Sequence, residues 1–263
     1  MNQLKYTNSV YHTVPEKISL FARTFPELSL YGRFINIVIK ASAKAKHHKY
    51  KDDDWCASSM GCLSALEKVG VNVEISGIHH MEQLDGPCVI IGNHMSLLEA
   101  IVLPTIVQPI RKVTYIVKQS LLDYPVFGHV MRSRDPIAVS RTSPRQDLTA
   151  VMDGGIKRLE RGVSIIAFPQ TSRMHGFDPS QFSTIGVKLA QKANVPILPL
   201  ALKTDAWGNG KYLKDFGKID PAKRVYFAFD KPIRVKGRGA EEHKAIIKFI
   251  TKKLAEWKTD SLG

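Results

Sequence analysis

The residues in this sequence best suited to chemistry are a histidine and a glutamate in the segment Gly92–Glu99, which reads G-N-H-M-S-L-L-E. An apolar stretch from Cys88 to Gly92 precedes the histidine, and a helical pattern starts at Leu97. His94 is therefore expected on a strand-to-helix turn, where the Glu99 carboxylate can fold back to one imidazole nitrogen. Such a pair suits a general base for an alcohol, which is a poor nucleophile until its proton is removed.

The same spacing has two simpler interpretations. Ser96 followed by Glu99 fits a capping box, S-x-x-E, which only satisfies backbone amides at the start of a helix. A histidine on a loop can also be a polar surface residue that takes no part in chemistry. The spacing alone leaves these alternatives open.

The order of the predicted elements indicates the fold that holds this segment. Short apolar strands alternate with helices, which predicts an α/β domain with a mostly parallel central sheet flanked by helices. In such sheets, functional groups gather in the loops at strand ends. Strands are predicted at 71–78, 88–92, 113–117, 137–140, 163–168, 197–202 and 225–229, and helices at 97–107, 121–131, 145–159, 185–193 and 241–257.

A different pattern occupies the N-terminal part of the chain. Residues 1–27 are expected to be irregular or partly helical, and a short helix is expected at 55–69. Between them, Ser29–Lys51 has apolar residues at helical spacing, many lysines and no acidic residue. A basic amphipathic helix of this kind can lie in a membrane interface, or it can pack on the body with its charged face in water. We divide the chain into an N-terminal helical segment, 1–70, and an α/β domain, 71–263.

Composition limits the partners of this protein. The 263 residues carry a formal net charge of +14, which attracts polyanions such as nucleic acid, anionic lipid headgroups or an acidic carrier protein. No stretch is apolar enough for a membrane-spanning helix and no secretory signal is evident, so we expect a cytoplasmic protein peripheral to the inner face of the cell membrane. The three cysteines form no C-x-x-C pair, and we expect reduced thiols and no metal site.

Four ordered blocks of residues resemble a known family. Val89–His94 with Glu99 is similar to the N-H-x4-D signature of the glycerolipid acyltransferases, the lysophosphatidic acid acyltransferase (PlsC-type) family. The related lipid A acyltransferases are similar in using H-x4-E. The other blocks are similar over Tyr115–Lys118 with Leu121, Pro125, Phe127 and Gly128, closing on Ile137–Arg141; over Phe168–Arg173; and over Gly186–Ala190 with Val195–Pro199.

Two blocks depart from the family pattern. Glu99 stands where the family usually has aspartate, and it keeps the charge on a side chain one methylene longer. Gln170 replaces a glutamate and Thr171 replaces a glycine of the F-P-E-G-T-R block. Threonine does not readily adopt the positive φ that glycine allows, so these two positions affect the expected binding of the acceptor.

The resemblance implies an O-acyltransferase that moves a fatty-acyl group onto a lysophospholipid hydroxyl, most simply that of 1-acylglycerol-3-phosphate. His94 would be the general base and Glu99 its partner. The donor would be an acyl-carrier-protein or coenzyme A thioester, with no other cofactor. By the same resemblance, Arg141 and Arg173 would bind the acceptor phosphate, which agrees with the match between guanidinium groups and phosphate oxygens. The remaining predicted binding residues are Lys118, Gln170, Thr171 and Ser172, with backbone amides of residues 169–173 as oxyanion donors.

Several rival functions follow from the same sequence. An acyltransferase of the same fold with another lipid acceptor is favoured by Gln170 and Thr171. A non-catalytic lipid-binding or membrane-surface protein is a further alternative, although His94, Glu99, Arg141 and Arg173 stand in register. Nucleic-acid binding fits the net charge only, because the basic clusters lack interleaved aromatic residues and a recognition motif. The apolar residues 100–107 can line an acyl tunnel or be part of the ordinary core.

Overall fold

The central sheet organises the molecule. The computed structural model describes residues 4–259 except 171 and 175. In this part, one sheet has the strand order β1-β2-β8-β7-β3-β6-β4-β5. Its strands are β1 Tyr11–His12, β2 Val73–Ser76, β3 Val89–Gly92, β4 Val113–Lys118, β5 Ile137–Val139, β6 Ser164–Ala167, β7 Ile197–Lys203 and β8 Val225–Phe229.

The strands that hold the chemically interesting loops are all parallel. β7, β3, β6, β4 and β5 form a continuous parallel block, because each pair of neighbours in this order runs in the same direction. β8 pairs antiparallel with β7, and the short β1 pairs antiparallel with β2. The predicted mostly parallel α/β sheet is confirmed, whereas β1 was not predicted because two residues are too few for a sequence pattern.

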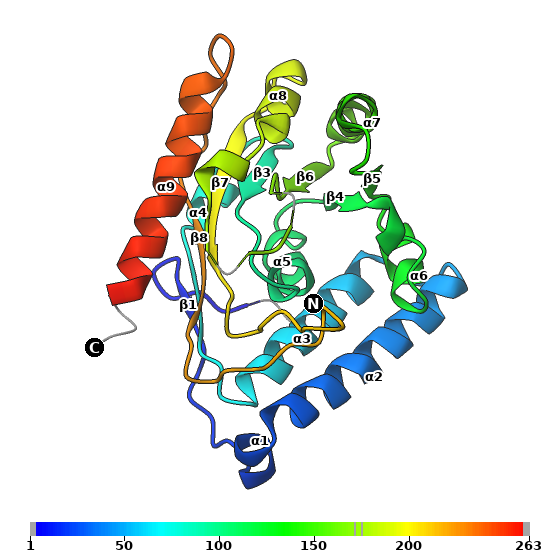
Figure 1. Ribbon diagram of the computed structural model, residues 1–263, viewed down its shortest axis with the longest axis vertical. Helices are drawn as coiled ribbons and strands as arrows, with labels where there is room; N and C mark the ends of the chain where they lie inside the picture. The colour runs from blue at the N-terminus through cyan, green and yellow to red at the C-terminus, as the bar shows by residue number, and fades with distance from the viewer. Residues whose placement is uncertain (1–3, 171, 175, 260–263) are drawn as a thin grey trace.

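Helices cover both faces of this sheet (Figure 1). Side chains alternate along the buried strands, so Ile90 joins the core on one face while Val89 and Ile91 join the core on the other. The first face carries α2 Pro26–Lys46, α3 Asp52–Glu67 and α5 Leu98–Val107; the second carries α7 Pro144–Glu160, α8 Ile185–Lys192 and α9 Ala240–Thr259. Shorter helices are α1 Leu20–Thr24, α4 His79–Glu82, α6 Phe127–Arg132, η1 Gln119–Leu121 and η2 Pro179–Gln181.

One predicted helix is wrong. The span 121–131 is not one helix. It contains the end of the 3-10 turn η1 and most of a separate helix, α6, and the residues between these two elements are not helical. Pro125 cannot donate a backbone hydrogen bond and disfavours helical geometry at the residue before it. Val126 then adopts a φ of 67°, which is rare for a β-branched residue and starts α6 in a new direction.

The basic N-terminal helix packs on the body. α2 begins at Pro26, where the missing N–H of proline costs no hydrogen bond, and ends at Lys46 rather than Lys51. Leu30, Phe34 and Ala41 of α2 are buried against the rest of the first core. α2 therefore shares a core with the sheet instead of standing apart from it.

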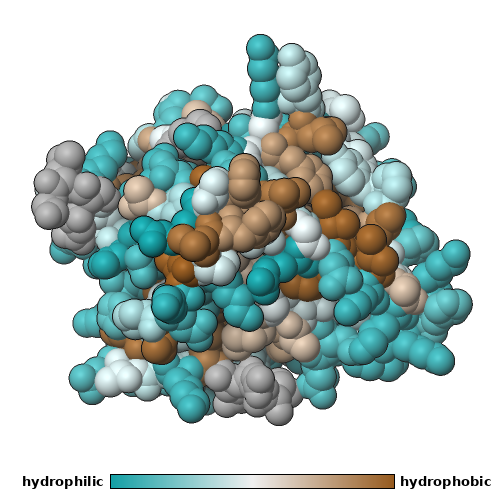
Figure 2. Space-filling model, turned by 90° about the horizontal axis from the view of Figure 1, so that it is seen from below, coloured by the Kyte–Doolittle hydropathy of each residue, from teal (hydrophilic) through white to brown (hydrophobic). Residues whose placement is uncertain are grey.

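The opposite side of α2 is open to solvent. Large apolar side chains are exposed on α1, α2 and the residue between them, namely Leu20, Phe21, Phe25, Leu28, Ile35 and Ile39, which we call the apolar face of α1 and α2. Figure 2, which views the molecule from this end, shows hydrophobic side chains gathered in the middle of the surface with hydrophilic ones around them. Within the described residues, none of the helices has the length and apolarity needed to cross a membrane.

Candidate active site

The predicted site residues meet at one edge of the sheet. His94 follows β3, Lys118 is the last residue of β4, Arg141 follows β5, and Arg173 lies in the loop after β6. These strands are parallel neighbours, so their carboxyl ends lie at the same edge. Each of the four residues lines a single cavity. The structure thus brings together four residues that are far apart in the sequence.

Asn93 fixes the turn that carries the histidine. Its amide nitrogen donates to the Leu202 carbonyl oxygen and its amide oxygen accepts from the Leu202 N–H, both at 2.8 Å. These two bonds extend the β3–β7 pairing by one residue through a side chain. Asn93 is buried, so an unpaired amide here would carry the full cost of desolvation. The backbone at His94 is therefore held against β7.

Glu99 is a buried carboxylate surrounded by donors. Its Oε1 lies 2.8 Å from His94 Nδ1 and accepts the backbone N–H of Met95 at 2.6 Å. Ser96 donates to it through its N–H and its hydroxyl, and the Thr204 hydroxyl donates at 2.6 Å. The predicted carboxylate–imidazole contact is present. The backbone hydrogen bonds that a capping box predicts are also present. The same carboxylate therefore binds the imidazole and the backbone.

These donors keep Glu99 ionised. Complete burial alone raises the pKa of a carboxyl group, but the hydrogen bonds from His94, Thr204 and Ser96 outweigh it and lower the pKa of Glu99 below its usual value. An ionised Glu99 accepts, so His94 Nδ1 donates to it. In the neutral form of the ring, Nε2 is the nitrogen that can accept a proton from a ligand.

His94 is also held by stacking on its ring and by hydrogen bonds to its backbone. It stacks on Phe168, the residue after β6, with ring centroids 4.6 Å apart and planes within 5°. The His94 backbone N–H donates to Gln170 Oε1 at 2.6 Å, and the His94 carbonyl accepts from the Met174 N–H. An aromatic face favours a positive charge, so Phe168 would stabilise a protonated His94 ring.

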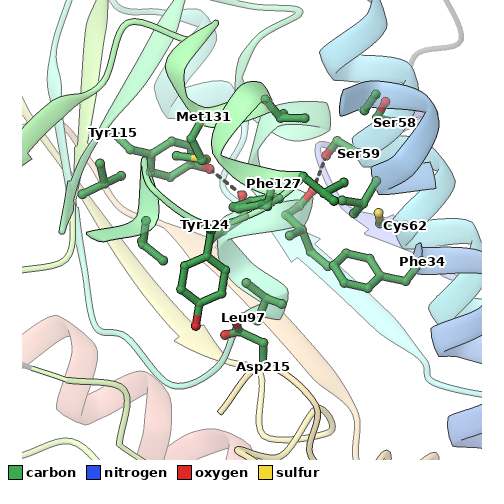
Figure 3. Close-up of a pocket in the computed structure, with 18 of the residues that line it drawn as sticks. Phe34, Ser58, Ser59, Cys62, Leu97, Tyr115, Tyr124, Phe127, Met131 and Asp215 are labelled. Carbon is green, nitrogen blue, oxygen red and sulfur yellow. Dashed lines mark hydrogen bonds between the residues drawn. The ribbon is translucent and has the colours of Figure 1, made fainter. Parts of the chain in front are cut away.

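A largely apolar cavity of about 420 Å³ opens beside the imidazole. Figure 3 shows that it lies between the helices of the first core face and the turn that leads to α6. The side chains that make its apolar wall include Phe34, Ile37, Val38, Cys62, Leu97, Ile101, Val117, Phe127, Val130 and Met131. Of the predicted tunnel segment 100–107, Ala100 and Ile101 line the cavity and Val102, Leu103, Ile106 and Val107 are core.

Cationic side chains line the same cavity. Lys118 and Arg141 are exposed as well as lining it, so they mark where it opens to solvent. The turn at Arg141, whose φ is 61°, is fixed by Asp147 of α7, which accepts the N–H groups of Ser140 and Arg141. Arg173 is more enclosed and forms an ion pair with Asp215.

The other predicted binding residues lie differently. Gln170 is buried behind the His94 turn and holds its backbone, as described above. Ser172 is partly buried and is not among the residues that line the cavity. Thr171 lies outside the described residues. The binding roles of all three stay predictions.

Four residues of the site were not assigned a role from the sequence. Asn93 and Phe168 directly follow strands and lie inside the blocks that resemble the family, so a role at the site could have been predicted for them. Thr204 directly follows β7, and its contact with Glu99 depends on the strand order. Asp215 lies in a segment between β7 and β8 with no regular pattern, and nothing in the sequence links it to Arg173.

The fold and the site together define a class of protein. A histidine at the end of a buried strand is oriented by a carboxylate and lines an apolar cavity together with two arginines, an arrangement suited to amphipathic anionic ligands.

A family profile described as Acyltransferase matches residues 72–203, about half of the chain, and the protein belongs to that family. The chain is 28% identical over 154 residues to a 1-acyl-sn-glycerol-3-phosphate acyltransferase of Pseudomonas aeruginosa, covering 59% of this chain and 57% of that protein. It is 28% identical over 139 residues to the protein of the same name from Borreliella burgdorferi, covering 52% and 54%. The chain spans about half the length of the curated relatives it matches.

A solved structure has the same fold. The crystal structure of the 1-acyl-sn-glycerophosphate acyltransferase PlsC from Thermotoga maritima aligns with a TM-score of 0.62, covering 91% of this chain and 94% of that one. The sequence identity is 20%, so the likeness concerns the fold.

Proposed function

We propose that this protein is an O-acyltransferase that moves a fatty-acyl group from a thioester to the free hydroxyl of a lysophospholipid of the 1-acylglycerol-3-phosphate type. The observation that carries the proposal is the His94–Glu99 pair at the wall of an apolar cavity that Arg141 and Arg173 also line. The names of the curated relatives support the same substrate class.

The reaction begins at His94 Nε2. This nitrogen takes the proton of the acceptor hydroxyl, and the alkoxide oxygen attacks the thioester carbonyl carbon. This attack forms the new C–O bond of a tetrahedral intermediate. The C–S bond of the intermediate then breaks. The departing thiolate receives the proton from His94, which returns the imidazole to its starting state. Glu99 stays ionised throughout and stabilises the imidazolium.

The acceptor phosphate is assigned to the arginines. A guanidinium fork donates two parallel hydrogen bonds to phosphate oxygens, which fixes orientation as well as position. Arg141 and Arg173 line the cavity that His94 lines, so a phosphate held there shares the cavity with the proposed base. Exposed Lys118 adds positive potential at the opening and favours the approach of an anionic donor or acceptor.

The acyl chain is assigned to the apolar part of the cavity. Burial of methylene groups is favourable by about 0.8 kcal/mol each, so an acyl tail is the natural occupant of a space lined by aliphatic and aromatic side chains. The cavity wall includes α2 residues such as Phe34 and Val38. We therefore infer that the N-terminal helices belong to the substrate site.

We also propose that the protein works at a membrane surface. The apolar face of α1 and α2 is exposed, and two of its residues, Ile35 and Ile39, also line the cavity. A lysophospholipid resides in a bilayer, so docking of this face would place the cavity next to its substrate. The net charge of +14 favours anionic lipid.

A direct assay tests the proposal. The purified protein is mixed with acyl-carrier-protein or coenzyme A thioesters and a panel of lysolipids in vesicles, and thiol release is followed. We expect release that depends on both the thioester and the lysolipid. His94→Ala should reduce the rate by at least about 10²-fold, because it removes the general base. The two donor arms distinguish carrier protein from coenzyme A.

A matched control separates loss of the base from loss of a histidine. His12 lies on the edge strand β1 with an exposed side chain outside the cavity, and His12→Ala should keep the wild-type rate. Glu99→Gln should lower kcat while the protein stays folded. Equal thiol release from the wild type and His94→Ala would defeat the assignment of the base.

A second acceptor class is favoured by one observation. Gln170 stands where the resembling family has a glutamate, and its neutral amide holds the turn of His94. A panel that includes lyso-aminolipids and lipid A-type precursors tests this alternative. If the alternative holds, thiol release is faster with one of these acceptors than with 1-acylglycerol-3-phosphate.

A further inference from the structure

Arg173 is held by a carboxylate from a distant part of the chain. Asp215 lies in the segment 204–224 between β7 and β8, and its Oδ1 is 2.7 Å from Arg173 Nη2. The two side chains are only 16% and 22% exposed, and both line the cavity. This ion pair is therefore enclosed next to the proposed substrate rather than dispersed in solvent.

The guanidinium of Arg173 is only partly satisfied. Its Nη1 is buried and has no hydrogen-bond partner among the described residues. A buried donor without a partner is unfavourable, so this nitrogen has unmet capacity for an acceptor. Asp215 thus occupies one nitrogen of the fork and leaves the other for a ligand oxygen.

The loop of Arg173 needs such an anchor. Arg173 lies in the irregular stretch after β6, outside any helix or strand. A long arginine side chain on such a stretch loses rotamer freedom when it binds a ligand, which weakens binding unless the side chain is already ordered. The bond to Asp215 provides this order before the ligand arrives.

The segment that carries Asp215 is held at two points. The indole N–H of Trp207 donates to the Asp215 carbonyl oxygen at 3.0 Å. Asn209 of the same segment donates to the Met95 carbonyl oxygen at 2.9 Å, which links the segment to the turn of His94. A Cβ at Gly217 would overlap the Gly208 carbonyl oxygen, so the segment closes tightly at a glycine.

The segment also rests on α2. The Tyr31 hydroxyl donates to the Gly217 carbonyl oxygen. Tyr31 and Phe34 of α2 pack against Trp207 with ring centroids 5.4 and 5.3 Å apart, and Phe216 lies 5.1 Å from Tyr31. The helix that lines the acyl cavity therefore supports the residue that holds Arg173.

We propose that Asp215 is a positioning residue for acceptor recognition: it orients Arg173 so that the free nitrogen of its fork meets the acceptor phosphate, and the segment 204–224 ties this orientation to α2. The inference rests on the proposed function, since it takes the ligand of Arg173 to be the acceptor phosphate. The opposite role, a carboxylate that competes with phosphate for Arg173, fits less well because Nη1 is already without a partner.

Asp215→Asn is the decisive variant. It keeps the size of the side chain and removes the charge that orders Arg173. We expect the KM for the lysophospholipid to rise about tenfold, with kcat and the KM for the thioester within about twofold of wild type. Asp215→Glu should recover part of the loss. Asp220→Asn removes the same charge from the same segment outside the cavity and should have no effect.

A double-mutant cycle tests whether Asp215 acts through Arg173. In an Arg173→Ala background, Asp215→Asn should cause no further change in acceptor KM, because the group it positions is gone. A lower acceptor KM in Asp215→Asn would show competition instead and overturn the proposal. So would an equal loss with and without Arg173, which would indicate a purely structural role. Thermal unfolding of each variant checks that the chain stays folded.

Binding measurements keep this test independent of turnover. A short-chain lysophosphatidate is titrated calorimetrically into the wild type, Asp215→Asn and Asp220→Asn. If the wild type transfers no acyl group but binds this probe, and only Asp215→Asn weakens binding, the proposed function fails while the positioning role stands. If turnover is normal and Asp215→Asn binds as the wild type does, the positioning role fails alone.

Discussion

Glu99 combines two functions that the sequence presents as alternatives. It accepts the backbone N–H groups of Met95 and Ser96, just before α5, as in a helix cap, and it accepts the Nδ1 proton of His94. Both are possible because Thr204 and Ser96 occupy its second oxygen and hold the carboxylate in place. The turn geometry and the orientation of the His94 ring therefore depend on one side chain.

The lowered pKa of Glu99 predicts how this contact responds to pH. A carboxyl group whose pKa is lower in the folded state contributes stability above its unfolded value, about 4.3, and loses it as pH falls through the folded value. Glu99→Gln should therefore lower the free energy of unfolding at pH 7 by about 1.5–3 kcal/mol, the range for hydrogen bonds to a charged group. The difference from wild type should shrink below about pH 4.3. Urea unfolding at several pH values measures it.

A control distinguishes Glu99 from carboxylates in general. Glu256 also has a lowered pKa, but it lies on the surface of α9 and pairs with Lys253. Glu256→Gln should change the free energy of unfolding by a few tenths of a kcal/mol, about what exposed pairs contribute. A pH-independent effect of Glu99→Gln would mean that the ionised carboxylate is not what stabilises the turn.

At the scale of elements, α3 and α2 define the depth of the cavity. Cys62 of α3 lines it together with Phe34 of α2, and Figure 3 shows Cys62 on the opposite side from Tyr115. A larger side chain at this position fills space that we assign to the acyl tail. Burial keeps the pKa of the Cys62 thiol raised to about 12, so it acts as a small apolar group.

Cys62→Met should therefore shift the acyl-chain preference. We expect the ratio of kcat/KM for a hexadecanoyl donor over a dodecanoyl donor to fall by about tenfold, the scale of excluding a methylene from an apolar pocket. Cys56→Met is a matched control, because Cys56 is buried in the same helix but does not line the cavity. An equal shift in both variants would indicate general overpacking of the core rather than a shortened cavity.

The elements also show what sequence can and cannot predict. The strands β3, β6 and β7 were predicted within one or two residues because each is a buried, mostly apolar run. His94, Arg141 and Arg173 were predictable as neighbours because each follows a strand of a parallel sheet. The two-part structure of 119–132 was not, since Pro125 and Val126 override a helical pattern.

Contacts that depend on tertiary packing could not be predicted from the sequence. The pattern of Ser29–Lys51 predicts a helix with an apolar stripe, but it does not say that this stripe covers a cavity beside His94. Likewise, nothing local to Asp215 marks it as the partner of Arg173, 42 residues away. These contacts follow from the way α2 and the segment 204–224 pack together, which periodicity does not encode.

At the scale of the whole molecule, charge and apolar surface occur together at the N-terminal helices. The apolar face of α1 and α2 is exposed, and Lys40, Lys46 and Lys49 are exposed on α2 and directly after it. Apolar burial and attraction to anionic headgroups both contribute to interfacial binding, and the second is screened by salt. α9 lies over the other face of the sheet and also carries exposed lysines, so it provides an internal comparison (Figure 1).

Replacing Lys40, Lys46 and Lys49 with glutamine should weaken binding to vesicles that contain anionic lipid by about 100-fold, since each basic residue near the surface contributes about 1 kcal/mol. Replacing Lys248, Lys252 and Lys258 of α9 removes the same charge and should leave the affinity within about threefold of wild type, because these residues do not face the bilayer in the proposed orientation. Sedimentation with vesicles at rising salt measures both, and the difference should vanish at high salt. Equal losses from the two triple variants would mean that net charge alone attracts the protein and that α1 and α2 do not dock.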